Sequence, residues 1–93
     1  MTNKNRKHED DFFEVKCNGD TLRLPAFLYP DFERCVRCET GLRTLSEIFD
    51  TYSKLTDELK EIFQFSIYNA ADDIISVADL FCMLKAFKRV FVG

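Results

Sequence analysis

The sequence predicts an α+β domain in which an N-terminal β-hairpin packs on about four short helices. Asn18 and Gly19 separate two short alternating segments, and an Asn-Gly pair between such segments is a strong hairpin signal. From Pro30 onward, apolar residues recur at a helical period. The 93 residues, of which 46% are apolar, are enough for one domain with a single core.

The hairpin is expected to pair residues 12–17 with residues 20–24 around the Asn-Gly turn. In this register Val15 faces Leu22, and Phe13 faces Leu24, on one side of the sheet. Glu14 faces Arg23 on the other side. One face of the hairpin is therefore apolar and suited to packing on helices.

Four helices follow in the prediction, each marked by an apolar stripe or a capping residue. The first spans residues 30–39, with Phe32, Cys35 and Val36 inward and Gly41 as its C-terminal cap. The second has the stripe Leu42, Leu45, Ile48, Phe49, Tyr52 and Leu55. The third begins at the N-cap Thr56 and buries Leu59, Ile62, Phe63, Ile67 and Ala70.

A capping box at residues 76–79 opens the fourth helix. Its apolar stripe consists of Val77, Leu80, Phe81, Leu84 and Phe87. Continuing the stripe would bring Lys88 into the core, so the helix should end near that residue. Residues 89–92 are β-prone and could add a third, C-terminal strand to the hairpin.

Residues 1–11 are expected to form a disordered arm, and residues 12–93 a single compact α+β domain. The arm is polar throughout and contains His8, the only histidine. The folded part therefore has no histidine, so nucleophilic catalysis is not expected. A chain this short also has little room for a deep substrate pocket. We therefore expect a protein that is not an enzyme.

The four cysteines allow three interpretations. Cys17, Cys35, Cys38 and Cys82 could form a four-thiolate zinc site, although the second Cys-x-x-Cys typical of such sites is missing. A redox role for Cys35 and Cys38 is disfavoured because both lie a full turn inside the predicted helix rather than at its N-terminus. We expect reduced core and surface thiols, no metal and no cofactor.

The third helix carries an unusual outward face. Phe65 and Tyr68 fall opposite its buried stripe, beside Glu58 and Glu61. One explanation is a helix buried on two sides; the other is an aromatic and acidic contact patch of the kind that anchors protein interfaces. Residues 39–84 carry three basic and nine acidic side chains, a net charge of −6 within a chain of net charge −3. This balance argues against direct nucleic-acid binding.

The C-terminal half resembles the ArdA-type antirestriction proteins in the order of its elements. The resemblance rests on a Leu-x-x-Leu helix, a second helix, a helix entered from an Ile-containing turn and a Val-rich end, at residues 42–49, 58–65, 74–82 and 90–92. That family recurs on plasmids, conjugative transposons and phages, and its members are non-enzymatic, acidic, DNA-mimicking dimers that block type I restriction enzymes. The resemblance gives this role to Glu47, Asp50, Asp57, Glu58, Glu61, Asp72, Asp73 and Asp79.

We therefore expect a small protein-binding inhibitor from a mobile element or phage. Its target would be a bacterial defence nuclease, a restriction or Cas enzyme, in the cytoplasm of the host. The expected contact residues are Glu47, Asp50, Glu58, Glu61, Phe65, Tyr68, Asp72 and Asp73. No signal peptide or membrane span is recognisable, and a homodimer is an option. The alternative is a regulatory or adaptor module, with or without the four-cysteine zinc site.

Overall fold

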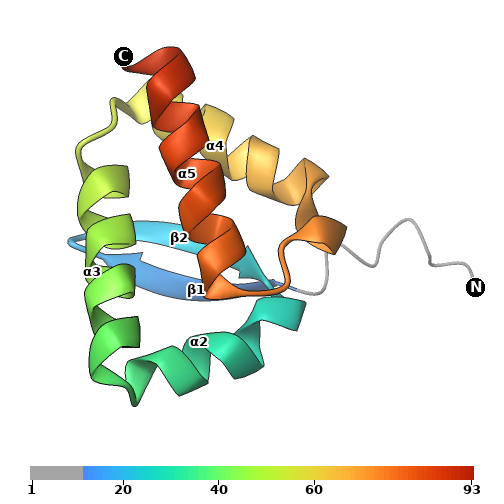
Figure 1. Cartoon of the computed structure of the whole chain (residues 1–93). Helices are drawn as coiled ribbons and strands as arrows, with labels where there is room; N and C mark the ends of the chain where they lie inside the picture. The colour runs from blue at the N-terminus through green and yellow to red at the C-terminus, as the bar shows by residue number, and fades with distance from the viewer. Residues whose placement is uncertain (1–11) are drawn as a thin grey trace, which may run out of the picture.

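The computed structural model describes residues 12–93, and it shows a two-stranded hairpin followed by four α-helices (Figure 1). The expected arm at residues 1–11, with His8, lies outside the described residues. The elements are β1 Phe12–Cys17, β2 Asp20–Pro25, η2 Ala26–Leu28, α2 Tyr29–Val36, α3 Glu39–Ser53, α4 Asp57–Asn69, η3 Ala71–Asp73 and α5 Val77–Phe91. The predicted α+β fold class is confirmed.

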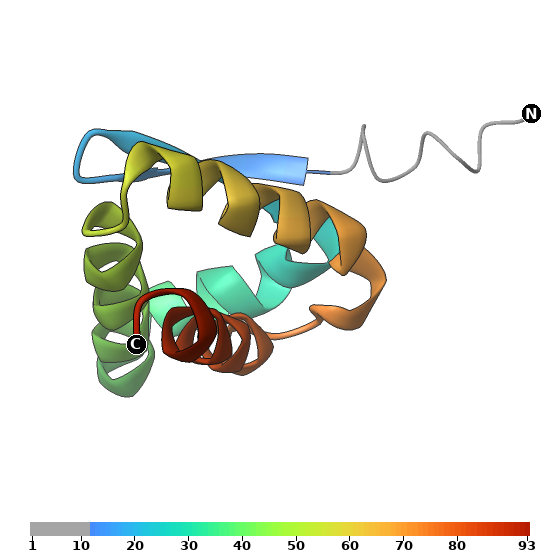
Figure 2. The same ribbon diagram turned by 90° about the horizontal axis from the view of Figure 1, so that it is seen from above.

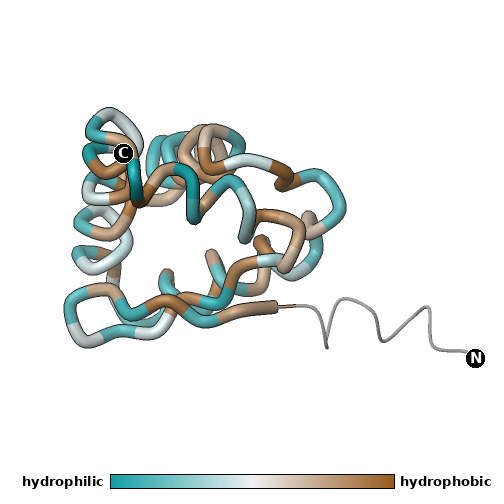
Figure 3. Tube along the Cα trace, turned by 90° about the horizontal axis from the view of Figure 1, so that it is seen from below, coloured by the Kyte–Doolittle hydropathy of each residue, from teal (hydrophilic) through white to brown (hydrophobic). Residues whose placement is uncertain are grey.

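The hairpin has the predicted register. Val15 pairs with Leu22, Phe13 with Leu24, and Glu14 with Arg23. Asn18 and Gly19 adopt φ angles of 51° and 95°, as the tight turn between two right-twisted strands requires. Figure 3 shows apolar and polar residues alternating along this hairpin, so that one face can pack on the helices.

The core lies between the apolar face of the hairpin and helices α3, α4 and α5. Phe63 of α4 is fully buried, with its ring centroid 6.1 Å from that of Tyr52 on α3 and 5.2 Å from that of Phe87 on α5. Leu22 and Leu24 of β2 are also fully buried and belong to the same cluster. This single cluster joins every major element, as expected for one small domain.

Helix α4 runs along the hairpin, whereas α5 lies on the far side of the molecule (Figure 2). The side-chain amide of Gln64 accepts a hydrogen bond from the Arg23 N–H at 2.9 Å and donates one to the Arg23 carbonyl oxygen at 2.8 Å. One turn earlier, Lys60 forms an ion pair with Asp20 at 3.1 Å. The outward-facing backbone of β2 is therefore bonded by a helix side chain instead of a third strand.

The predicted caps of the last two helices are confirmed. Thr56 accepts a hydrogen bond from the Leu59 N–H, and Ser76 accepts one from the Asp79 N–H, both at 3.1 Å. Asp79 in turn accepts a hydrogen bond from the Ile75 N–H at 3.2 Å. The bonds to Thr56 and Ser76 satisfy N–H groups that the first turn of a helix leaves unpaired, and the bond from Ile75 ties the residue before the N-cap to the helix.

The expectation for the chain end was wrong. Residues 89–92 add no strand, because α5 continues to Phe91, beyond the expected stop near Lys88. Lys88 is exposed, so its charge does not oppose the helix, and it lies with Arg89 in the last turn, where cations are favourable. The Phe91 ring, 4.6 Å from that of Phe87, packs on the preceding turn.

Gly41 was expected to cap the first helix, but it does not. Helix α2 ends at Val36, and Gly41 is buried in the first turn of α3. A Cβ atom at Gly41 would lie 2.5 Å from the Cα of Cys35, so this glycine allows the two helices to approach closely. Glycine is required here by packing, not by a helix end.

Three side chains expected to face inward are instead exposed. Val36, Leu42 and Ile62 have exposed fractions of 43%, 49% and 37%. The break between α2 and α3 turns Val36 and Leu42 outward, and α4 is rotated so that one side contacts β2 while Ile62 faces away from the core. Among residues 12–93, no helix is long and apolar enough to cross a membrane.

Candidate protein-contact site

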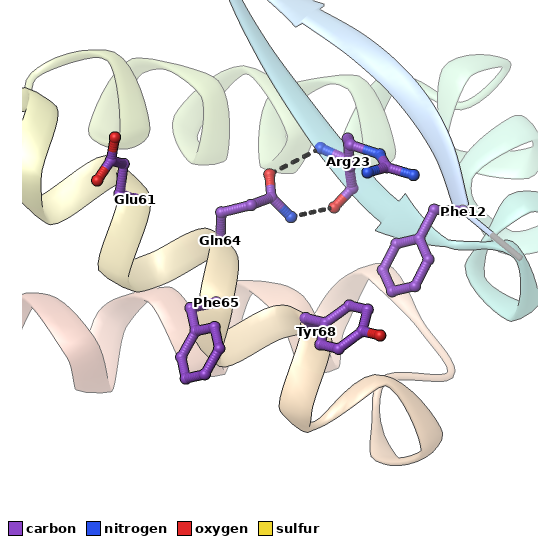
Figure 4. A pocket seen from close by; sticks show the side chains of 6 residues that line it. All are labelled: Phe12, Arg23, Glu61, Gln64, Phe65 and Tyr68. Atoms are coloured by element: carbon purple, nitrogen blue, oxygen red, sulfur yellow. Dashed lines mark hydrogen bonds between the residues drawn. The ribbon is translucent and has the colours of Figure 1, made fainter. Parts of the chain in front are cut away.

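Three of the predicted contact residues line one groove on the outer side of α4. Glu61, Phe65 and Tyr68 border it together with Gln64, and Phe12 and Arg23 complete it from the hairpin (Figure 4). The groove has a volume of about 310 Å3. We call these six residues the aromatic groove.

An aromatic stack joins the two sides of the groove. The rings of Phe12 and Tyr68 are nearly parallel, with an interplanar angle of 19° and centroids 5.7 Å apart. The Arg23 guanidinium carbon lies 5.5 Å from the centre of the Phe12 ring, a distance that permits a cation–π contact. Because Gln64 fixes the Arg23 backbone, helix and strand hold the stack from both sides.

Phe65 is the most exposed part of this aromatic cluster. Its exposed fraction is 63%, and none of the described rings stacks on it. Tyr68 is half-buried, and its ring stacks on Phe12. The outward orientation predicted for Phe65 is therefore present, and Tyr68 forms a wall of the groove instead of projecting freely.

The groove offers an apolar surface with charges at its margin. Arg23 contributes a cation and Glu61 a carboxylate, so a partner can be oriented by charge as well as by contact with the rings. Aromatic side chains in a hollow with a polar margin are typical anchors of protein interfaces. Its chemistry therefore fits the docking of an apolar side chain from another protein.

The remaining predicted contact residues do not join the groove. Glu47 and Asp50 line a different hollow, of about 390 Å3, together with Lys54 and Lys88. Glu58 is exposed in the first turn of α4. Asp72 and Asp73 are exposed in η3, beyond the end of α4. The structure therefore brings together the aromatic part of the predicted site but not all of its acidic part.

The sequence interpretation missed the residues that complete the groove from the hairpin. The hairpin register already placed Arg23 on the outward face, and by alternation Phe12 as well. No local pattern, however, indicates that α4 lies against the outer side of β2. Nothing in the sequence indicates the role of Gln64, because a glutamine at that position is indistinguishable from an ordinary exposed polar residue of a helix.

The four cysteines do not converge on one point. Cys17 is buried, Cys35 is half-buried, and Cys38 and Cys82 are exposed. Across residues 12–93, no three His, Cys, Asp or Glu side chains form a group able to hold a metal ion. The four-thiolate zinc site considered for the adaptor alternative is therefore not formed in this structure.

Cys38 lies where the sequence interpretation did not place it. It is the N-cap of α3, not a residue inside the preceding helix. The backbone N–H groups of Gly41 and Thr40, in the first turn of α3, lower the pKa of the Cys38 thiol below its usual value. The prediction that Cys38 lies a full turn inside the first helix was therefore wrong.

Comparisons of this chain with protein-family models, with curated proteins and with solved structures gave no match. The resemblance to ArdA-type proteins stays a prediction, and proposals about function rest on the surface of the domain.

Proposed function

We propose that this chain is a small, non-enzymatic protein-binding domain that docks on its partner through the aromatic groove. The observation that carries the proposal is the exposure of Phe65 beside a groove whose walls are built by two elements. Exposing a large aromatic ring is unfavourable in water, and burying it against a partner removes that cost. The Phe12 and Tyr68 stack provides a preformed surface for the same contact.

For the partner, we propose a bacterial defence nuclease, either a restriction or a Cas enzyme, which the domain inhibits as an anti-CRISPR or antirestriction protein. Glu58 and Glu61 lie on the same side of α4 as Phe65 and give this side a negative margin. A nuclease binds its nucleic acid through a basic cleft, and a negative surface with an aromatic anchor can occupy such a cleft. A regulatory partner of another class would use the same groove.

The groove is tested by truncating its most exposed ring. Purified wild type and Phe65→Ala are titrated against a panel of restriction and Cas nucleases, with nuclease inhibition and binding affinity as the two measurements. As a hot-spot residue, Phe65 should account for at least about 2 kcal/mol, or roughly a 30-fold loss of affinity. Its exposure means that the stability of the fold should change little.

Phe91→Ala is the matched control. Phe91 is also an exposed aromatic residue on a helix, with an exposed fraction of 53%, but it does not line the groove. This variant should bind like the wild type. If the wild type inhibits none of the nucleases, the proposed partner class is wrong; if a partner is found and Phe65→Ala binds it unchanged, the groove is not the contact site.

A further inference from the structure

The junction between α2 and α3 contains a pair of thiols beside the N-terminus of α5. Cys35 and Cys38 line a hollow of about 490 Å3 that also includes Asp31, Thr40 and Val77. The Asp31 carboxylate accepts a hydrogen bond from the Val77 N–H at 2.7 Å, so α2 is tied to α5 on the other side of the hollow. This site shares no lining residue with the aromatic groove.

The backbone holds the two cysteines close together. The Cys38 N–H donates a hydrogen bond to the Cys35 carbonyl oxygen at 3.1 Å, which closes a four-residue turn. The ends of such a turn have Cα atoms within about 7 Å of each other, close to the upper limit of the span that a disulfide bridges. Gly41 keeps the first turn of α3 against Cys35, so the junction is firmly packed.

The two thiols have different surroundings. Cys38 is exposed at the N-terminus of α3, where the N–H groups of Thr40 and Gly41 stabilise its thiolate and the Arg34 cation adds to this effect. Cys35 is half-buried, and its Sγ lies 3.9 Å from Asp31 Oδ2, to which it donates. The arrangement therefore provides one accessible nucleophilic sulfur and a second, shielded sulfur beside it.

We propose that Cys38 and Cys35 form a dithiol site that reacts with low-molecular-weight disulfides such as glutathione disulfide, with Cys38 as the attacking residue and Cys35 as the resolving residue. In the first step the Cys38 thiolate attacks one sulfur of the reagent: a Cys38–sulfur bond forms, the reagent's disulfide bond breaks, and one glutathione thiolate leaves. In the second step Cys35 attacks the Sγ of Cys38, which releases the second glutathione. The released thiolate takes up the Cys35 proton.

The balance of the reaction is a two-electron exchange. The protein dithiol is oxidised to the Cys35–Cys38 disulfide, and the reagent disulfide is reduced to two thiols. The hollow beside Cys38 leaves space for the first adduct. No metal and no further co-reactant is required.

The other two cysteines provide internal controls. Cys82 is exposed on α5 beyond the first turn of the helix, where backbone N–H groups are already bonded to carbonyl oxygens within the helix. Cys17 is buried, and burial raises the pKa of its thiol to about 11. At neutral pH, Cys38 should therefore react several-fold faster than Cys82, and Cys17 should not react in the folded protein.

The test combines mass spectrometry of intact protein and peptides after incubation with glutathione disulfide. The wild type should form a transient glutathione adduct on Cys38 and then lose it as the Cys35–Cys38 disulfide appears. Cys35→Ser should stop at the stable Cys38 adduct. Cys38→Ser, which keeps a good N-cap at this position, should form neither product.

Cys82→Ser should behave like the wild type, and a circular dichroism spectrum of each variant checks that it is folded. The rate of alkylation by iodoacetamide, measured as a function of pH, gives an independent readout. Because the pKa of the Cys38 thiol is lowered, its rate should rise at a pH below the usual pKa of a cysteine thiol. The proposal is overturned if folded Cys35→Ser loses its adduct as the wild type does, or if Cys38 and Cys82 react at the same rate. Because the site is separate from the aromatic groove, Cys38→Ser should leave partner binding intact.

Discussion

The buried Cys17 thiol interacts with two other titratable groups, Asp20 and Tyr52, at the closed end of the hairpin. Its exposed fraction is 1%, and it faces Asp20 across the strands. Burial, and then the Asp20 carboxylate, raises the pKa of the thiol to about 11 from 9.0. The pKa of Tyr52 is also raised, by burial first and then by the charges of Asp20 and Cys17. Cys17 and Tyr52 therefore both resist taking on a negative charge.

The raised pKa of Cys17 makes stability depend on alkaline pH. Well below pH 9.0 the Cys17 thiol is neutral in both the folded and the unfolded chain, so it does not affect stability there. Above pH 9.0 the thiol ionises in the unfolded chain before it does in the folded one. The free energy of unfolding therefore falls until about pH 11. The full loss is on the order of 2 to 3 kcal/mol, from two pKa units at about 1.4 kcal/mol each. Urea titrations at several pH values measure it.

Cys17→Val provides the comparison, because valine fills much of the same space and does not ionise. The variant should be less sensitive to pH between 9 and 11, while Tyr52 still contributes some dependence. Equal slopes for wild type and variant would show that the Cys17 thiol does not titrate with a raised pKa.

At the scale of elements, α4 determines how the hairpin is held. Lys60, Gln64 and Tyr68 are spaced four residues apart and so lie on one side of the helix. They contact Asp20, the Arg23 backbone and Phe12 respectively. A lone two-stranded hairpin is marginal in water, so these three contacts and the core contribute the stability that a third strand would supply.

Gln64→Ala should loosen the outer side of β2. Both hydrogen bonds to Arg23 are lost, and because the bonded groups can still reach water, the expected loss of stability is about 1 to 2 kcal/mol. Chemical denaturation measures the loss, and hydrogen exchange of the Arg23 amide should become faster. Gln64→Glu can still accept from the Arg23 N–H but cannot donate to its carbonyl oxygen, so it should be destabilised as well. Unchanged stability and exchange in both variants would mean that the amide does not hold the strand.

Elements with local signals were predictable from the sequence, and those set by tertiary contacts were not. The Asn-Gly turn fixed the hairpin register, and the Thr56 and Ser76 caps marked where α4 and α5 begin. The role of Gly41 depends on how closely Cys35 approaches it, which no pattern within one helix reveals. The end of α5 was missed because the orientation of Lys88 depends on what surrounds the helix.

The aromatic groove was predictable in part for the same reason. Helical periodicity was enough to place Glu61, Phe65 and Tyr68 on the outward side of one helix. Phe12 and Arg23 come from the hairpin, more than 35 residues earlier in the chain. Their meeting depends on how α4 docks on β2, which is a property of the packed domain.

At the scale of the whole molecule, the negative charge is divided among several places. Glu58 and Glu61 lie on the side of α4 that carries Phe65, whereas Glu47 and Asp50 share their hollow with Lys54 and Lys88. The cations of that second hollow offset its acids over short distances. If negative charge guides the domain to a basic partner, the α4 acids should therefore matter more than the α3 acids.

Charge reversal separates guidance by charge from anchoring by the ring. Glu58→Lys with Glu61→Lys should lower the association rate with the partner and weaken its dependence on salt, because long-range attraction acts mainly on encounter. Glu47→Lys with Asp50→Lys changes the net charge by the same amount in the mixed hollow and is the matched control, with a smaller expected effect. Phe65→Ala should instead raise the dissociation rate with the salt dependence unchanged, since the ring contributes only after contact.

Surface plasmon resonance at several salt concentrations measures both rates for each variant. Equal effects of the two charge reversals would mean that net charge alone guides the domain, and a slower association for Phe65→Ala would contradict the division of roles between the ring and the acids.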